Sequence, residues 1–386
     1  MTKKADILNE WTQRVENKLL FRITSPYIRK ELAKHLINGA IEGKEIEVAF
    51  TSKREKELAK QVFEAWIRRV SEQFVWLDRS DYSRALIRAL KLSLEFVTTD
   101  YDRSKKRDWA QIWTDTARGF LGEIALSKFF KEKFEVELML DNRKIPLEEA
   151  LESDVIGIKV QGGKIIKPTK RISIKTSKFQ ARWLDIPGEQ ISKSDVFFLV
   201  KIGISDKHFL SYLKDISFLR DKLFQEGKTI SEITEEEADQ LWNSIENLEP
   251  IPAYIPGFLL KESINLPIHE LKFKLKGKKQ EITEKATVEI TKALGVITIS
   301  NIKNFILSKT NLNDFKKLLE NRNIDDETAQ TIRNIIQNDK VEYVISGIGR
   351  VISSKYKHFL ATSGSLQHDP RAFKKLLNII LGATNA

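Results

Sequence analysis

Two acidic residues and one lysine in the middle third of the sequence are the side chains best suited to chemistry. Glu123 lies within an apolar helical pattern, Asp154 opens a strand-like run, and Lys175 lies in the next such run. An ionised acid is costly to bury unless a cation, a metal or a change of protonation compensates it. Each residue also has an ordinary interpretation: a helix-edge acid that reaches solvent, a turn residue, and a lysine on a solvated face.

A helix over Trp109 to about Phe134 is expected to position Glu123. A step of about 100° per residue places mostly apolar side chains around Glu123 on one face. They are Ile112, Thr116, Phe120, Leu126, Ser127, Phe130 and Phe134. The carboxylate is therefore predicted to lie within a buried stripe.

Strand-like runs after this helix are expected to carry the other two residues. They cover Val136–Leu140, Val155–Val160, Arg171–Ser177 and Asp195–Ile202. The second and third runs, joined by a turn at Gln161–Lys164, are predicted to form a hairpin. Strand alternation then puts Ser173, Lys175 and Ser177 on one face, and Ile172, Ile174 and Thr176 on the other.

The order of these residues resembles the PD-(D/E)xK nuclease superfamily, and within it the type II restriction endonucleases. The resemblance runs from Arg118 to Ile204. It is carried by Gly119-Phe-Leu-Gly-Glu123-Ile-Ala, Ser153-Asp154, Ser173-Ile-Lys175-Thr-Ser and the aromatic strand Ser194-Asp195-Val-Phe-Phe. It implies an α/β (α+β) fold, with a restriction-endonuclease-like mixed central sheet flanked by helices and helix-rich N- and C-terminal additions.

The resemblance also implies roles for the three residues. Asp154 would be the metal-binding carboxylate, Glu123 the helix acid, and Lys175 the lysine that orients or activates the attacking water and stabilises developing phosphorane charge. The implied cofactor is Mg²⁺.

Ser173 departs from the family pattern, which has Asp or Glu at this position as a second carboxylate. We expect Glu123 to fill that role, ahead of Glu152 and Asp185. The competing interpretation is an inactive nuclease fold that is kept for binding.

The composition favours a polyanionic partner. The 386 residues contain 65 Lys and Arg against 54 Asp and Glu, a net charge of +11, and basic residues release counterions from a phosphate backbone. Seven Lys or Arg and no acid lie between Lys164 and Arg182. The candidate DNA-binding residues are Lys164, Lys170, Arg171, Lys178 and Arg182. Phe179 and Trp183, interleaved among them, are expected to anchor the segment to the core rather than to stack on bases.

Several other classes of protein lack support. The chain has no cysteine, which excludes disulfides and thiolate chemistry and fits a cytoplasmic location better than a secreted one. No run of about 18 apolar residues indicates a membrane span. The five histidines have no zinc-site spacing, and the GxxxxGK[ST] loop of an ATP-driven motor does not occur.

Four segments are predicted. They are a helical region at 1–100 that is a candidate for DNA binding, the nuclease core at 101–230, an acidic connector and mixed segment at 231–282, and a helix-rich region at 283–386 that is a candidate for DNA recognition or dimerisation. The first includes helices after Ser52 and over Tyr82–Phe96, and a short strand at Ile46–Phe50. Acids at 231–249 followed by Pro250, Pro252 and Pro256 indicate an exposed connector. Gly347–Arg350 is read as an ordinary turn, in preference to a DNA-binding helical hairpin.

The resulting prediction is a Mg²⁺-dependent endonuclease that cuts double-stranded DNA, of the type II restriction kind, with a homodimer implied by the resemblance. Two alternatives stay open. One is a transposon-end, repair or junction nuclease of the same fold, and the other is a catalytically inactive nucleic-acid-binding protein.

Overall fold

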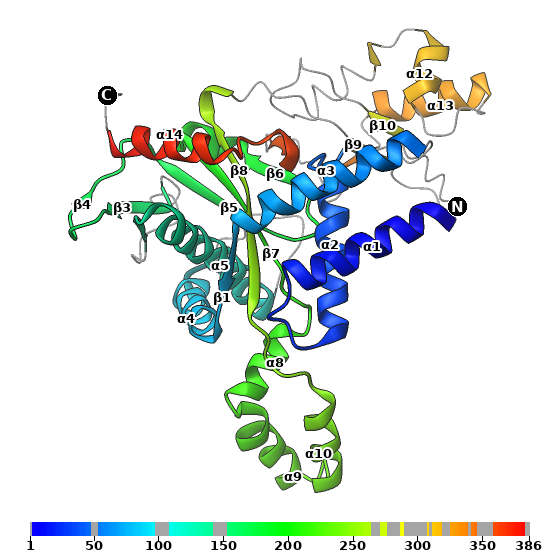
Figure 1. Cartoon of the computed structure of the whole chain (residues 1–386). Helices are drawn as coiled ribbons and strands as arrows, with labels where there is room; N and C mark the ends of the chain where they lie inside the picture. Colours follow the sequence, from blue (N-terminus) through cyan, green and yellow to red (C-terminus); the bar gives the residue numbers. More distant parts are fainter. Residues whose placement is uncertain are drawn as a thin grey trace.

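A computed structural model describes most of the chain (Figure 1). The described residues are 2–47, 53–96, 108–141, 153–263, 271–275, 286–288, 307–308, 311–318, 325–338, 341–345 and 358–382. They form mixed and antiparallel sheets together with helices, which confirms the α+β class. Within them, no helix combines the length and the apolar character that crossing a lipid bilayer requires.

A four-stranded mixed sheet forms the centre of the molecule. Its strands, in spatial order, are β1 (Phe74–Leu77), β8 (Ile251–Leu260), β7 (Val196–Ile202) and β5 (Ile172–Lys178). β5 and β7 run parallel, whereas β8 is antiparallel to both of its neighbours. Every residue of β7 is buried, as expected for a strand that is covered on both faces.

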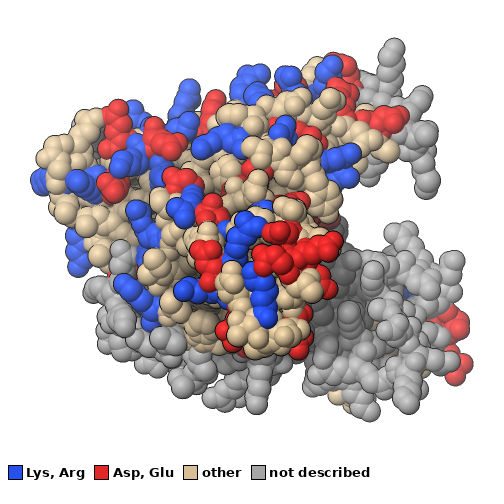
Figure 2. Space-filling view, turned by 90° about the horizontal axis from the view of Figure 1, so that it is seen from below, with Lys and Arg blue, Asp and Glu red and all other residues tan. Residues whose placement is uncertain are grey.

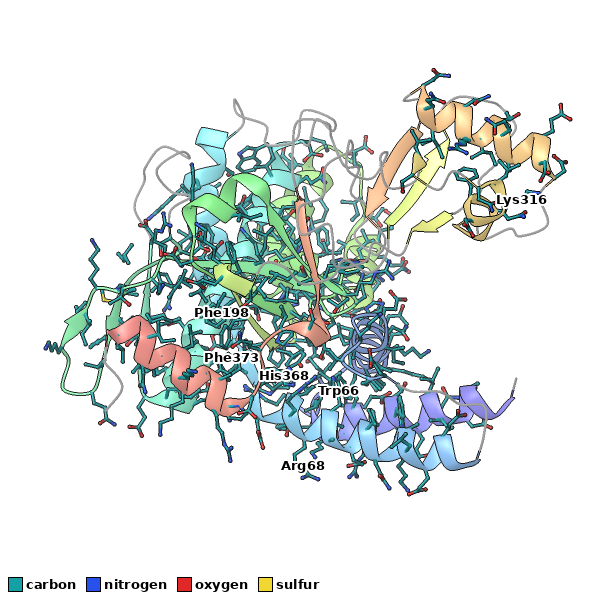
Figure 3. All side chains as sticks on the ribbon, turned by 90° about the horizontal axis from the view of Figure 1, so that it is seen from above. Trp66, Arg68, Phe198, Lys316, His368 and Phe373 are labelled. Carbon is teal, nitrogen blue, oxygen red and sulfur yellow. The ribbon has the colours of Figure 1, made fainter. Side chains whose placement is uncertain are left out.

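Helices cover one face of this sheet. They are α4 (Arg79–Phe96), α5 (Trp109–Phe134) and α14 (Pro370–Leu381). Alternate β7 residues, Val196, Phe198 and Val200, join this core. The ring of Phe373 on α14 stacks on Phe198 with centroids 6.5 Å apart, and both are labelled in Figure 3.

The opposite face is covered by other elements. Phe197 and Leu199 of β7 pack in a second cluster against the antiparallel pair β6 (Trp183–Pro187) and β12 (His358–Thr362). The N-terminal helices are α1 (Thr2–Lys18), α2 (Pro26–Glu42) and α3 (Lys53–Glu72). They enclose their own core, which also includes Phe179 and Tyr254.

The remaining elements surround this centre. A three-stranded antiparallel sheet is formed by β2 (Glu137–Leu140), β3 (Val155–Lys159) and β4 (Ile165–Ile166). A helical lobe lies at the bottom of Figure 1 and contains α8 (His208–Asp215), η1 (Leu219–Phe224), α9 (Gln225–Thr229) and α10 (Glu235–Ser244). The other elements are α7 (Gly188–Lys193), η2 (Lys261–Ser263), β9 (Leu271–Leu275), β10 (Ala286–Val288), α12 (Leu312–Leu318), α13 (Asp326–Gln337), β11 (Val341–Ile345) and η3 (Ser363–Ser365).

Helix α5 has the predicted bounds, and α3 and α4 confirm the two predicted N-terminal helices. The four predicted strands of the middle third correspond to β2, β3, β5 and β7. The described part of the predicted strand at Ile46–Phe50 is not a strand, and residues 48–50 lie outside the described residues, as does Gly347–Arg350.

The predicted hairpin between β3 and β5 is wrong. The turn at Gln161–Lys164 is tight and contains two glycines with positive φ, Gly162 and Gly163. It returns the chain into β4, which pairs with β3, and β5 then takes β7 as its parallel partner.

The prolines after the acidic segment were also misread. Residues 231–249 are largely exposed, as predicted, and contain α10. Pro252 and Pro256, however, lie within β8, a buried central strand. The register between β7 and β8 shifts around Pro256, and at such an irregularity a proline, which has no backbone N–H, is tolerated. The backbone carbonyl of Pro252 accepts a hydrogen bond from Gly203 N at 2.8 Å.

The predicted segment boundaries do not separate independent cores. The central sheet takes β1 from 1–100, β5 and β7 from 101–230, and β8 from 231–282. Helix α14, from 283–386, closes the same core. Elements of all four segments therefore share one interior.

Candidate functional site

Helix α5 carries Glu123 across the face of β5. Gly122, which has no side chain, faces Thr176 of β5, and the Thr176 hydroxyl donates to the Gly119 carbonyl at 3.1 Å. The helix therefore lies very close to the strand that bears Lys175. Glu123, the next residue along α5, is only 14 % exposed, so the predicted burial of this acid is confirmed.

Asp154 is fixed by the start of β5. Its backbone nitrogen donates to the Ile172 carbonyl at 2.8 Å, and its Oδ2 accepts from the backbone nitrogen of Ile174 at 2.5 Å. The neighbouring Ser153 hydroxyl accepts from Ile172 N at 3.1 Å. Although β3 and β5 do not pair as strands, these contacts place Asp154 directly beside the Ser173–Lys175 segment.

Ser173 and Lys175 share one side of β5, as the strand alternation predicts. Ile172 and Ile174 point into the helical core. Ser173 is only 5 % exposed and its hydroxyl is hydrogen bonded to the Asp154 carboxylate. Lys175 is half-buried, and its charge acts on both Asp154 and Glu123.

Both acids of the centre are harder to ionise than free carboxylic acids. Burial, followed by the negative charge of Asp154, raises the pKa of Glu123 well above its usual value, against the opposing charge of Arg88. Burial also raises the pKa of Asp154, although Lys175, the Ile174 amide and Ser173 act against it. Two buried carboxylates with raised pKa values form a centre of negative potential that favours a cation or a proton.

Two residues of this centre lie outside the predicted site. Arg88 of α4 lies with its Nη2 3.8 Å from Glu123 Oε2 and donates to the Asp141 carbonyl at 3.2 Å. Asp141 directly follows β2, and its negative charge raises the pKa of both Glu123 and Asp154. Its backbone nitrogen donates to the Asp154 carbonyl at 3.0 Å. An acid immediately after an apolar strand was the signal available for Asp141, whereas nothing in the motif pointed to Arg88.

The donor set fits a hard divalent cation. Mg²⁺ is usually held by one or two carboxylates, with water and substrate phosphate completing its shell, and Glu123 and Asp154 supply two. Among the residues that the structure describes, no group of three or more His, Asp or Glu side chains is arranged to hold a metal ion. Glu123 and Asp154 would therefore hold the ion together with oxygens from water and substrate.

Most of the predicted DNA-binding residues are engaged with acids. Arg171 forms a two-pronged pair with Asp195, which ties the starts of β5 and β7 together. The other pairs are Lys170–Glu262, Lys178–Asp206 and Arg182–Glu42. Lys164 lies exposed in the turn between β3 and β4.

The aromatic residues of this segment belong to the interior. Phe179 and Trp183 are 1 % and 2 % exposed, which confirms that they anchor the segment to the core. Of the alternative ligands, Asp185 lies in β6 opposite Leu360 of β12, and Glu152 lies outside the described residues.

Comparison with protein-family models, with curated proteins and with solved structures finds no match.

Proposed function

We propose that this protein is a Mg²⁺-dependent endonuclease that hydrolyses phosphodiester bonds of double-stranded DNA, with a restriction-endonuclease-like core. One observation carries the proposal. Two buried carboxylates on different elements, Glu123 of α5 and Asp154 before β3, both have raised pKa values and lie beside a half-buried lysine, Lys175. An arrangement this costly to the folded state is typical of a catalytic centre.

The neutral residue at position 173 is compatible with activity in this arrangement. The Ser173 hydroxyl supports the ionised form of Asp154, and Glu123 brings the second negative oxygen from the helix side. The site thus keeps two carboxylates although β5 supplies none.

The proposed reaction is a hydrolysis in which water is the only co-reactant. The water oxygen forms a bond to phosphorus as the bond from phosphorus to its leaving oxygen breaks. The attacking water loses one proton, and in the net reaction the leaving oxygen gains it. Lys175 orients the attacking water and offsets the charge that accumulates on the phosphoryl oxygens. Mg²⁺, when bound, supplies Lewis-acid stabilisation of the same charge. Glu123 and Asp154 would hold the ion, and Arg88 holds Glu123 and the Asp141 backbone in place.

The experiment is cleavage of plasmid DNA with Mg²⁺ by the wild type, Asp154→Asn, Glu123→Gln and Lys175→Ala, with DNA binding measured in Ca²⁺. The wild type is expected to cut, and each variant is expected to lose at least about a hundredfold in rate while still binding. Wild-type protein that binds DNA but never cuts it would establish the binding-module alternative. Normal cutting by Glu123→Gln would refute the assignment of the second carboxylate.

The type of nuclease is tested with the digestion products. Discrete, reproducible fragments from unmodified genomic DNA support a type II-like restriction enzyme. Nicking that depends on branches or ends supports a repair, junction or transposon-end nuclease. Sedimentation of the protein bound to a short duplex tests the proposed homodimer.

A further inference from the structure

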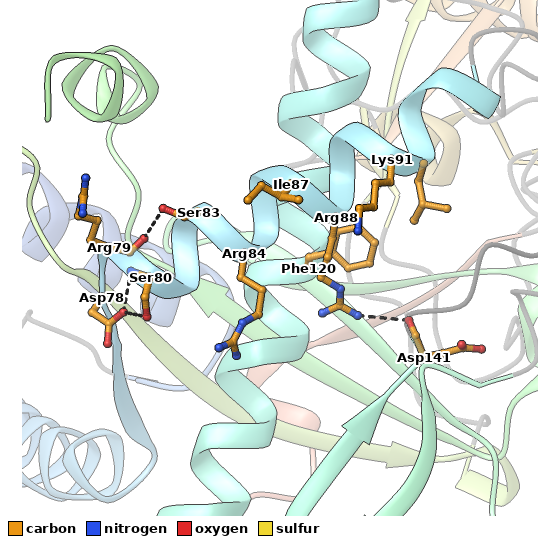
Figure 4. A pocket seen from close by; sticks show the side chains of 11 residues that line it. Asp78, Arg79, Ser80, Ser83, Arg84, Ile87, Arg88, Lys91, Phe120 and Asp141 are labelled. Atoms are coloured by element: carbon orange, nitrogen blue, oxygen red, sulfur yellow. Dashed lines mark hydrogen bonds between the residues drawn. The ribbon is translucent and has the colours of Figure 1, made fainter. Parts of the chain in front are cut away.

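A basic row on helix α4 lies at the rim of the acidic centre. Arg84, Arg88 and Lys91 are spaced by four and three residues, which places them on one helix face. They line a cavity of about 960 Å³, together with Phe120 of α5 and Asp141 (Figure 4). Seven residues of helix rise by about 10 Å, so the row runs along a considerable part of the cavity wall.

The two outer members of the row are exposed positive charges. Arg84 and Lys91 are exposed, and neither forms an ion pair with a side chain that the structure describes. Arg88 lies deeper, with its guanidinium over the Phe120 ring at 4.5 Å. The charge of Arg84 adds to the positive potential around Arg88. Like charges this close favour an anion between or beside them.

A second hollow adjoins the first at the same arginines. It has a volume of about 370 Å³ and is lined by Arg84 and Arg88 together with Lys128 and residues of β2. Lys128 is paired with Asp81, and Asp78 at the start of α4 is held by Ser80 and lines only the far end of the first cavity. The positive charges of the cavity wall that have no acidic partner among the described side chains are thus Arg84 and Lys91, and Arg88 between them is paired with Glu123.

The helical lobe has the opposite charge character. The first turn of α10 contains Glu235, Glu236 and Glu237, and Figure 2, which looks onto the lobe, shows acidic side chains gathered there. A polyanion would be repelled from α10 and attracted to α4.

We propose that the Arg84–Arg88–Lys91 row of α4 binds backbone phosphates of the DNA strand next to the bond that is cut. This inference rests on the proposed nuclease function, because it assigns the phosphate track that leads to Glu123 and Asp154. It replaces the predicted basic segment at 164–182, where four of the five candidates are paired with acids. Phosphate contacts position the duplex and carry no sequence information.

The test is the salt dependence of binding to a random-sequence fluorescent duplex, measured in EDTA so that no cutting occurs. Each phosphate contact contributes a slope of about −0.9 to log K against log salt. The double variant Arg84→Gln/Lys91→Gln is expected to bind more weakly at low salt and to reduce the slope by about 2. The control Lys207→Gln/Lys222→Gln removes two exposed lysines of the lobe and is expected to leave the slope unchanged.

Two results would overturn the inference. One is a salt slope in the α4 variant equal to that of the wild type, or a reduction of the slope in the control variant as large as that in the α4 variant. The other is calorimetric binding of free deoxynucleoside monophosphate that disappears in the α4 variant, which would make the cavity a small-molecule site. If the wild type cuts DNA but the α4 variant has the same salt slope as the wild type, this inference is refuted and the nuclease proposal stands. A reduced slope in a protein that does not cut DNA with Mg²⁺ refutes the nuclease proposal, while the phosphate contacts of α4 stand.

Discussion

A Cβ atom added to Gly122 of α5 would lie 1.8 Å from Oγ1 of Thr176 in β5. Two heavy atoms that are not bonded to each other do not approach so closely, so any side chain at this position must push the helix away from the strand. Because Glu123 follows Gly122 and Lys175 precedes Thr176, the same displacement would separate the two halves of the candidate site.

Gly122→Ala is therefore expected to destabilise the protein by about 1–3 kcal/mol, the usual cost of overpacking a core, and to reduce DNA cleavage more than DNA binding. Denaturant unfolding and plasmid cleavage measure the two effects. Gly119→Ala is the matched control, because a Cβ at Gly119 meets nothing within 4 Å. Equal behaviour of the two variants would show that the close contact does not position the site.

The metal-free protein is expected to lose stability as the pH rises. The pKa of Glu123 is raised above its ordinary 4.5, so between that value and its folded-state pKa the native state binds more protons than the unfolded state. Unfolding free energy then falls by up to about 1.4 kcal/mol per pH unit for this group. Thermal unfolding in EDTA is expected to show a smaller decline for Glu123→Gln.

Ca²⁺ should reverse this effect in the wild type, raising the melting temperature more at alkaline than at acidic pH. The Glu123→Gln variant should respond less. A melting temperature that ignores Ca²⁺ in both proteins would contradict a cation site at these carboxylates.

Ser173→Ala is expected to move the acidic limb of the pH–rate profile to higher pH. The Ser173 hydroxyl is one of the groups that lower the pKa of Asp154, so its removal leaves Asp154 harder to ionise. The measurement is kcat/KM for cleavage against pH, with Ser177→Ala as the control on the same side of β5. A limb that stays in place, or that moves to lower pH, would show that Ser173 does not act through Asp154.

Glu45→Gln is expected to destabilise the fold by about 3–5 kcal/mol, because it leaves a buried charge without its partner. Lys201 Nζ lies 2.8 Å from Glu45 Oε1, and both side chains are fully buried. Burial raises the pKa of Glu45, but Lys201 and Arg69 outweigh it and hold this pKa at about 2.

The direction in which the stability of the wild type changes with pH follows from that low pKa. The stability that Glu45 contributes is present above its ordinary pKa of 4.5 and is lost as the pH falls towards 2. Acid unfolding of the two proteins should therefore converge at low pH. A difference in stability that stays constant over this range would exclude Glu45 as the titrating group.

Local sequence patterns predicted the helix and the strands of the site better than they predicted which strands pair with each other. The bounds of α5 followed from a 3.6-residue apolar period, and the alternation in β5 placed Lys175 correctly because Ile172 and Ile174 do face the core. The pairing of β5 with β7 could not be read in this way, since β5 satisfies its backbone with a strand that lies beyond β6 in the sequence.

The basic segment at 164–182 offers less unpaired positive charge than its composition suggests, for a similar reason. Lys170, Lys178 and Arg182 are neutralised by acids far away in the sequence, at Glu262, Asp206 and Glu42. A run of like charge in the sequence says nothing about partners that only the fold brings near. The α4 row forms no run of like charge in the sequence, because apolar residues separate Arg84, Arg88 and Lys91.

The position of α14 in the chain has a consequence for synthesis of the protein. Phe373 contacts the rings of Phe129, Phe130, Phe198 and Phe258, yet the ribosome makes it after every strand of the central sheet. A nascent chain that already holds Glu123, Asp154 and Lys175 would still expose this aromatic surface. We expect such chains to be held by chaperones until α14 emerges, so that the candidate site matures only after α14 has been made.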